Sequence, residues 1–195
     1  MKKILVLLVL LPVLAACART SGYTTPFETG GKVYKLALMP WHSSTMTFDF
    51  RYRWTMTQAL RDSCRQSGVF KLDWSAYPVN GGNVELLENL DSATFWERVK
   101  YGRYVPVVEK VRKATAGLGA DLAVLYDVSA DNAAPTDDDA MDYRADYVRI
   151  FLVDLNTGQV TVDFIRTNFL RKRAFGDIKV VTLRALNKWL AETKQ

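Results

Sequence analysis

Cysteine and histidine are scarce in this chain of 195 residues, which contains two cysteines and one histidine. Two cysteines exclude the framework of several disulfides that stabilises many small exported domains. A zinc site needs several histidine or cysteine ligands at set spacing, so no metal site is predicted. The sequence also lacks a run of about 20 apolar residues, the length that a membrane-spanning helix needs. The apolar run at residues 4–14 is too short for that role.

The chain also lacks a large excess of either charge, because 26 basic and 21 acidic residues give a net charge of +5. This balance argues against a nucleic-acid partner. A histidine-based catalytic triad would need a nucleophile and a carboxylate placed by the fold, and the sequence has no Gly-x-Ser-x-Gly elbow. We therefore predict no catalytic residues and no cofactor, and expect that the protein is not an enzyme.

The first seventeen residues have the order of a bacterial export signal. Lys2 and Lys3 form a basic start, an apolar run follows, and a Leu-Ala-Ala-Cys motif ends at Cys17. A basic region, a short apolar region and small residues before a cut site typify a removable signal peptide. The motif resembles the lipobox of lipoproteins, which implies removal of residues 1–16 and attachment of diacylglyceryl and a further acyl chain, such as palmitate, to Cys17. An ordinary signal peptide with an incidental Cys17 is the alternative.

The residues after Cys17 predict where the protein is held. In enterobacteria-like sorting, Asp at the next position retains a lipoprotein in the inner membrane, so Ala18 implies the outer membrane by resemblance. Residues 17–32 are rich in Thr, Gly and Ser and predict a flexible, lipidated tether. The residues between Cys17 and Lys32 reach at most about 45–50 Å. We therefore expect one periplasmic domain, residues 33–195, held close to the membrane.

Apolar patterning predicts the elements of this domain. Strands are predicted at residues 33–41, 69–74, 121–129, 143–155 and 159–169. Helices with one apolar stripe are predicted at residues 51–66, 106–118 and 176–192. Shorter helices are predicted at residues 84–90 and 92–100, and Gly158 favours a tight turn before the last strand.

The order of these elements predicts the fold class. The first strand is apolar on both faces, which is typical of a strand inside an α/β sheet. The short joints to the next helix and strand favour a parallel crossover. We predict an α/β (α+β) domain in the order β-α-β-α-β-β-β-α, with a mixed sheet of about five strands and helices on both faces.

Four segments resemble a family of bacterial envelope domains that includes the N-terminal domain of TolB, the lipoprotein CsgG and the activator LpoB. They are residues 35–40 (KLALMP), 67–72 (SGVFKL), 119–124 (GADLAV) and 152–160 (LVDLNTGQV). The resemblance covers most of residues 33–192. It implies an envelope lipoprotein with an α/β domain that binds a protein partner. A looser resemblance to LptE implies lipopolysaccharide handling as the alternative.

The predicted tether and length separate this chain from some of these relatives. LpoB-type activators resemble long-armed proteins, whereas the tether here is short. CsgG-type channels insert amphipathic hairpins into the membrane, and this chain has little length for them. We therefore expect a non-enzymatic outer-membrane lipoprotein that binds a protein partner in envelope assembly or secretion, with its oligomeric state left open. A domain that binds a small ligand near His42, at the carboxyl end of the first strand, is a further alternative.

Candidate contact residues fall in two segments. In residues 48–54 aromatics alternate with charges, as on an exposed strand, although the end of this segment also fits the following helix. The extended alternative makes it a docking edge for a protein, and the predicted partner contacts are Trp41, Phe48, Phe50 and Trp54. The basic run Arg171, Lys172 and Arg173 is a candidate contact for lipid headgroups, or a solvated turn. The acidic run at residues 131–142 lacks the spacing of a calcium loop and predicts a solvated loop.

Overall fold

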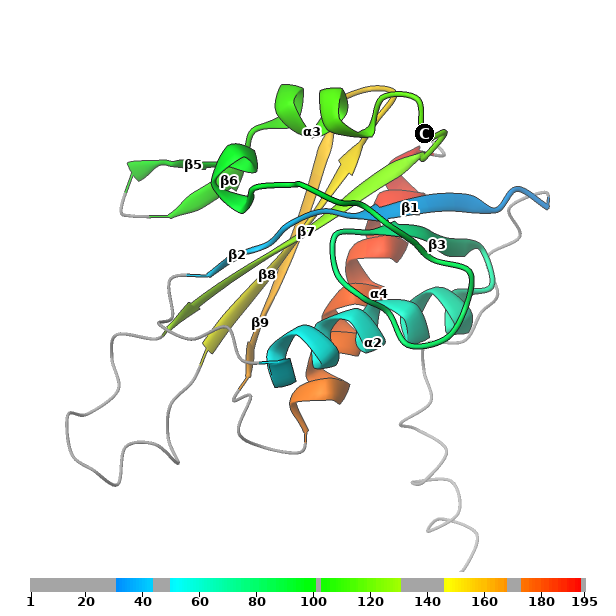
Figure 1. Ribbon diagram of the computed structural model, residues 1–195. Coiled ribbons are helices and arrows are strands. Elements are labelled where there is room, and N and C mark those ends of the chain that lie inside the picture. The colour runs from blue at the N-terminus through cyan, green and yellow to red at the C-terminus, as the bar shows by residue number, and fades with distance from the viewer. Residues whose placement is uncertain (1–30, 44–49, 101–102, 131–145, 168–172, 194–195) are drawn as a thin grey trace, which may run out of the picture.

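The computed structural model describes residues 31–43, 50–100, 103–130, 146–167 and 173–193 (Figure 1). It contains a seven-stranded mixed sheet with helices on both faces and a separate two-stranded sheet, which confirms the predicted fold class. Among these residues, no helix is both long and apolar enough to cross a membrane. Cys17 and the acidic run at residues 131–142 lie outside the described residues.

The large sheet has the order β4-β3-β1-β7-β8-β9, and β2 also pairs with β7. The strands are β1 (Tyr34–Leu38), β2 (His42–Ser43), β3 (Phe70–Ser75), β4 (Glu85–Leu86), β7 (Leu122–Ala130), β8 (Asp146–Asp154) and β9 (Val160–Thr167). Pairing is parallel from β4 to β7, and β8 and β9 then run antiparallel. The five long strands are those predicted. The two-residue strands β2 and β4 were not anticipated.

Strand β7 contributes to both faces of the sheet, because successive side chains of a strand point in opposite directions. Leu122, Val124 and Tyr126 are buried on one face, while Ala123 and Leu125 are buried on the other. β7 also joins the parallel strands to the antiparallel hairpin. Its apolar sequence therefore reflects burial on both sides.

Helices α2 (Phe50–Ser67) and α4 (Ala174–Thr193) cover the first face (Figure 1). Their predicted apolar stripes are largely buried there: Met56, Ala59, Leu60, Ser63, Cys64, Ile178, Val181, Ala185, Leu186, Trp189 and Leu190. The Tyr126 hydroxyl, on β7, lies 2.9 Å from the Thr182 hydroxyl of α4. This hydrogen bond satisfies two polar groups inside the core.

Cys64 lies in the same core and behaves as a small apolar side chain, as the sequence predicts. Burial raises the pKa of its thiol to about 12, so the thiol stays protonated at neutral pH. A protonated thiol is a poor nucleophile, so Cys64 has a structural role.

The second face is covered by smaller elements. They are the 3-10 helix η2 (Ser92–Phe95), the hairpin of β5 (Trp96–Arg98) and β6 (Tyr104–Pro106), and helix α3 (Val108–Thr115). Phe95, Trp96 and Val111 pack against Met39, Leu125 and Phe151 of the sheet. We call these elements the second layer.

The second layer corrects the prediction of short helices at residues 84–90 and 92–100. The first of these segments contains only strand β4, and the second forms a single 3-10 turn, capped by the carboxylate of Asp91, before β5. α3 begins after Pro106, later than predicted, because residues 104–106 pair with β5. Local patterning did not reveal this pairing, which joins segments separated by several residues.

The aromatic segment at residues 48–54 overlaps the start of helix α2. The helix begins at Phe50, so residues 50–54 follow the helical alternative and do not form the extended docking edge. On a helix, Tyr52 and Trp54 point in different directions. Tyr52 is half-buried, and Trp54 is 46% exposed. Phe48 lies outside the described residues.

The role of the α2–α4 core predicts a large loss of stability for Leu186→Ala. Leu186 is fully buried, and its truncation removes apolar contacts and leaves a cavity. We expect the free energy of unfolding to fall by about 2–5 kcal/mol in urea titrations. Val180→Ala, on the exposed side of the same helix, is the matched control and should change it by less than about 0.5 kcal/mol. Equal losses would show that α4 does not pack as described.

Candidate functional site

The second layer covers only part of its sheet face. Phe151 is buried and meets the Trp96 ring edge-on at 5.6 Å, whereas Phe164 on β9 is 60% exposed. In Figure 1 one end of β7, β8 and β9 continues beyond α3 and the β5–β6 hairpin. Among the described residues, the sheet face therefore has a covered half and an uncovered half.

We call the uncovered half the open half-face. Strand register places Arg149 beside Phe164 and Tyr147 beside Arg166, so these four side chains share one face. Val162 follows on the same side of β9 and is 38% exposed. The Arg166 guanidinium lies 5.8 Å from the centre of the Tyr147 ring. Aromatic and arginine side chains thus dominate this surface.

A buried carboxylate lies at the inner border of the open half-face. Asp127 of β7 is fully buried, and each of its oxygens has a cationic or polar partner. The Nδ1 atom of His42 lies 2.7 Å from Oδ1, and Nε of Arg149 donates to Oδ2 at 2.7 Å. A carboxylate without such partners would be costly inside a protein. Arg149 therefore neutralises Asp127 while extending onto the open half-face.

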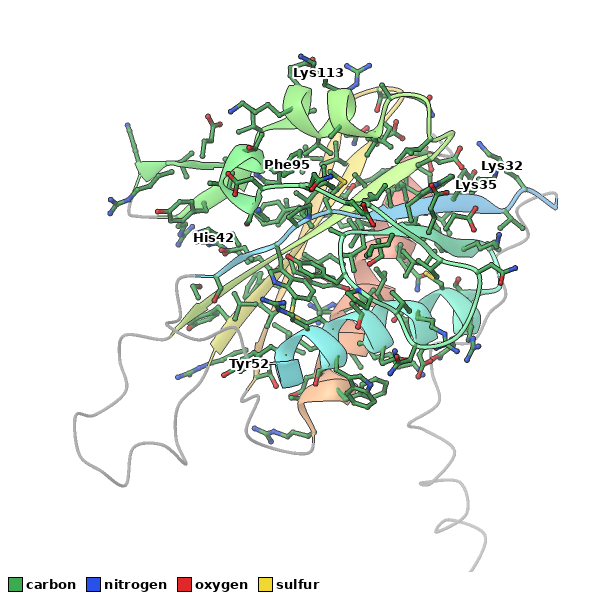
Figure 2. All side chains as sticks on the ribbon, viewed as in Figure 1. Lys32, Lys35, His42, Tyr52, Phe95 and Lys113 are labelled. Carbon is green, nitrogen blue, oxygen red and sulfur yellow. The ribbon has the colours of Figure 1, made fainter. Side chains whose placement is uncertain are left out.

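His42 connects this carboxylate to the second layer. Its ring stacks on Tyr104 of β6 with centroids 3.7 Å apart, and Trp96 lies 5.8 Å away at a tilted angle. The contacts hold the β5–β6 hairpin against β2 and β7. Figure 2 shows His42 on the side of the molecule where the hairpin lies. The geometry thus gives the single histidine a structural role between two layers.

The polar groups of the cluster bind one another. Both oxygens of Asp127 are engaged, one by His42 and the other by Arg149. In the described part of the chain, no three His, Cys, Asp or Glu side chains are grouped so as to hold a metal ion. The arrangement can fix the hairpin and orient Arg149.

The outer edge of β9 is occupied by side chains of α4. Arg184 donates to the carbonyl of Phe164 at 2.9 Å, and Lys188 donates to the carbonyl of Val162 at 3.3 Å. Arg184 also holds Asp163 through two bonds of 2.7 Å. Exposed strand edges invite pairing with another chain, and charged side chains are a common means of blocking it. The open half-face is therefore accessible, while the neighbouring edge is obstructed.

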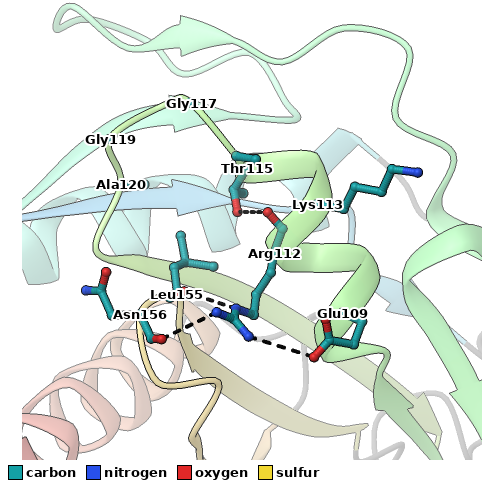
Figure 3. Close-up of a pocket in the computed structure, with 10 residues that line it drawn as sticks. Glu109, Arg112, Lys113, Thr115, Gly117, Gly119, Ala120, Leu155 and Asn156 are labelled. Carbon is teal, nitrogen blue, oxygen red and sulfur yellow. Dashed lines mark hydrogen bonds and ion pairs between the residues drawn. The ribbon is translucent and has the colours of Figure 1, made fainter.

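Figure 3 shows an open pocket of about 540 Å³ where α3 ends near the turn between β8 and β9. Arg112 crosses it and donates to the carbonyls of Leu155 and Asn156 at 3.1 and 3.4 Å. Its guanidinium also lies 3.8 Å from the carboxylate of Glu109. Arg112 thus fastens α3 to the hairpin turn, and the structure gives it a packing role.

The predicted partner contacts on aromatic residues are not brought together. Trp41 is only 5% exposed, so it does not form a surface contact. Its ring stacks on Tyr77 at 3.8 Å, and burial raises the pKa of Tyr77 to about 12. Trp54 is exposed on α2, on the other side of the sheet from Phe164, and the Phe50 side chain is outside what the structure describes. Sequence reasoning missed Phe164, Arg149 and Asp127.

Of the basic residues predicted to contact lipid headgroups, the structure describes only Arg173. Arg171 and Lys172 lie outside the described residues. Arg173 is exposed at the start of α4, with Nε 3.9 Å from the carboxylate of Asp177. A pair of this kind at a surface contributes little to stability, so Arg173 is available to solvent.

Comparison with solved structures finds matches at low sequence identity. A variant of PelC from Paraburkholderia phytofirmans, solved as a dodecamer, is 13% identical with a TM-score of 0.43, covering 78% of this chain and 88% of PelC. The LpoB C-terminal domain from Salmonella enterica is 12% identical with a TM-score of 0.34, covering 72% and 87%. A hypothetical protein from Chlamydia trachomatis is 12% identical with a TM-score of 0.38, covering 82% and 95%.

These TM-scores are all below 0.5, so the similarities carry no conclusion about function. LpoB is also among the proteins that the sequence resembles. No protein-family model matches the chain, and no curated protein matches it in sequence. The site is therefore argued from its own residues.

The burial of Asp127 predicts that Asp127→Asn destabilises the fold. The change leaves Arg149 without its charged partner and weakens the bond to His42. We expect a loss of about 2–4 kcal/mol in urea unfolding. Asp163→Asn breaks the more exposed pair with Arg184 and is the control, with an expected loss of about 1 kcal/mol. A smaller loss for Asp127→Asn than for the control would contradict a central role for this carboxylate.

Proposed function

We propose that the chain is a non-enzymatic lipoprotein, anchored through Cys17 at the periplasmic face of the outer membrane. Its α/β domain binds a protein partner in envelope assembly or secretion. The observation that carries the proposal is the exposed aromatic Phe164 on a sheet face that the second layer leaves uncovered. The lipobox-like motif before Cys17 supplies the envelope location.

The composition of the open half-face favours a protein as the partner. Tyr147, Phe164, Arg149 and Arg166 are the residue types enriched at protein interfaces. A large exposed aromatic surrounded by arginines fits an interface hot spot, where one anchor residue contributes most of the affinity. Asp127 holds the Arg149 guanidinium and is itself held by His42, so part of this surface is ordered before binding.

The obstruction of β9 favours face-to-face docking over addition of a strand. A partner strand would have to displace Arg184 and Lys188 from the carbonyls of Phe164 and Val162. It would also compete with the paired charge of Asp163. Docking on the side-chain face leaves these contacts intact.

The non-enzymatic assignment rests on the chemistry of the described residues. The single histidine is stacked on Tyr104 and bonded to a carboxylate that Arg149 also neutralises. A general base must lie within hydrogen-bond reach of the proton that it abstracts from a substrate. His42 is positioned for packing instead. Handling of lipopolysaccharide, the alternative from the sequence, would use Arg173 and its neighbours.

The docking proposal predicts that Phe164→Ala weakens binding of the partner by about thirtyfold, as for a hot-spot aromatic worth about 2 kcal/mol. The partner is first identified by placing a photo-crosslinking residue at Val162 of the full chain in cells, followed by mass spectrometry. Its affinity is then measured with purified proteins. Phe164→Ala should leave stability nearly unchanged, because the side chain is 60% exposed.

Two matched variants decide whether the effect belongs to the open half-face. Val180→Ala removes an exposed apolar side chain from α4 and should not alter affinity. Trp54→Ala tests the aromatic segment predicted from the sequence. A loss with Trp54→Ala but not with Phe164→Ala would move the partner site to α2. Crosslinking only to lipopolysaccharide would favour the lipid-handling alternative.

The anchor proposal predicts that Cys17→Ser abolishes incorporation of labelled palmitate and releases the chain from the membrane. Several acyl chains on one residue hold a protein firmly, since each buried methylene contributes about 0.8 kcal/mol. Cys64→Ser is the control, because Cys64 is buried and should not carry lipid. Labelling that persists in Cys17→Ser would reject the lipobox assignment.

A further inference from the structure

The end of the domain where the tether arrives carries a group of lysines. Chain segment 31–33 leads into β1, and the parallel strands β1, β3 and β7 all start at this end. Lys32 precedes β1, Lys35 lies in β1, and Lys71 lies in β3. We call these three residues the strand-start lysines. Figure 2 shows Lys32 and Lys35 at the outer margin of the molecule.

The strand-start lysines extend further into solvent than the acids beside them. The side chains of Lys32 and Lys71 are 56% and 60% exposed, whereas their partners Asp121 and Asp73 are 21% and 12% exposed. Asp121 also accepts from the backbone N–H of Lys35 at 2.8 Å. The carboxylates thus lie inward, and the ammonium groups form the outer layer of this end.

Two of the lysines are cross-strand neighbours. Lys35 of β1 is in register with Lys71 of β3, so their side chains leave the sheet on the same face. Lys71 is paired with Asp73 at 2.5 Å, which offsets part of the repulsion between the two lysines. Two adjacent cations fit an anionic surface.

An anchor at Cys17, as proposed above, would place these lysines near the membrane. The residues between Cys17 and Lys32 span at most about 50 Å when extended and about 20 Å as a random coil. Tyr34 meets Trp189 edge-on at 4.9 Å, so the C-terminal part of α4 lies at the tether end. Arg173 is sixteen residues earlier on the helix, about 24 Å further away. Arg173, the described residue of the basic run, is therefore on the distal side of the domain.

We propose that the strand-start lysines contact anionic lipid headgroups of the membrane that holds Cys17. The inference rests on the proposed lipid anchor. The contact orients the domain with its strand starts toward the bilayer and the His42 end of the sheet away from it. Each basic residue near an anionic membrane surface favours contact about fivefold, the equivalent of about 1 kcal/mol. Lys32 and Lys71 are also paired with Asp121 and Asp73, so the contact biases the orientation of a tethered domain and does not hold the domain unaided.

The test measures lysine acetylation in the complete lipidated protein, reconstituted in vesicles of phosphatidylcholine alone or with phosphatidylglycerol. Mass spectrometry follows the acetylation rate of each lysine. We expect Lys35 and Lys71 to react about fivefold more slowly in the vesicles with phosphatidylglycerol. Lys100 and Lys179, away from the strand starts, are internal controls whose rates should not change.

A pair of variants separates a local contact from general charge attraction. Lys35→Gln with Lys71→Gln should remove most of the protection of Lys32 in the anionic vesicles. Lys100→Gln with Lys179→Gln loses the same charge and should leave that protection unchanged. Equal rates in both kinds of vesicle, or equal protection of Lys179 and Lys35, would overturn the proposal.

Flotation of the vesicles distinguishes this inference from the function on which it rests. If the chain floats with the vesicles but its lysines are unprotected, the headgroup contact is wrong and the anchor stands. If the chain does not float, anchor and contact are both wrong. Partner binding is measured without vesicles, so its outcome is independent of either result.

Discussion

The structure depends on the requirement that β7 be buried on both faces. Its alternate side chains complete two separate cores, one beneath α2 and α4 and the other beneath the second layer. The same strand joins the parallel strands on one side to the antiparallel hairpin on the other. A charged residue in such a strand has to find partners on neighbouring strands, and Asp127 does so through His42 and Arg149. The site at the border of the open half-face thus follows from the central position of β7.

Much of the architecture could be predicted because it is expressed in local patterns. The two-sided apolar run of β7, the stripe of α4 and the turn at Gly158 each identify an element without knowledge of its neighbours. The β5–β6 hairpin could not be predicted in this way, because Trp96 and Pro106 pair across a gap in the sequence. Each of these two strands is only three residues long, so the spacing of apolar residues does not distinguish it from a short helix.

The site was less predictable than the fold for the same reason. His42 and Asp127 are 85 positions apart, so no local motif contains them both. Phe164 belongs to an alternating strand pattern that equally suits a buried face. Phe164 is exposed because the second layer ends before it. The alternating pattern of β9 does not show how far the second layer reaches. By contrast, the Trp41 ring, expected at the surface, is covered by Tyr77 from 36 positions away.

The side chains that cover the edge of β9 have a consequence for an anchored protein. Molecules tethered to one membrane move in two dimensions and share a common height and orientation. Neighbours then meet sideways far more often than they would in free solution, which raises the chance that one sheet edge finds another. Arg184 and Lys188 place charges at the strand edge where such encounters would occur. In the anchored state proposed above, these two residues would oppose growth of a continuous sheet along the membrane.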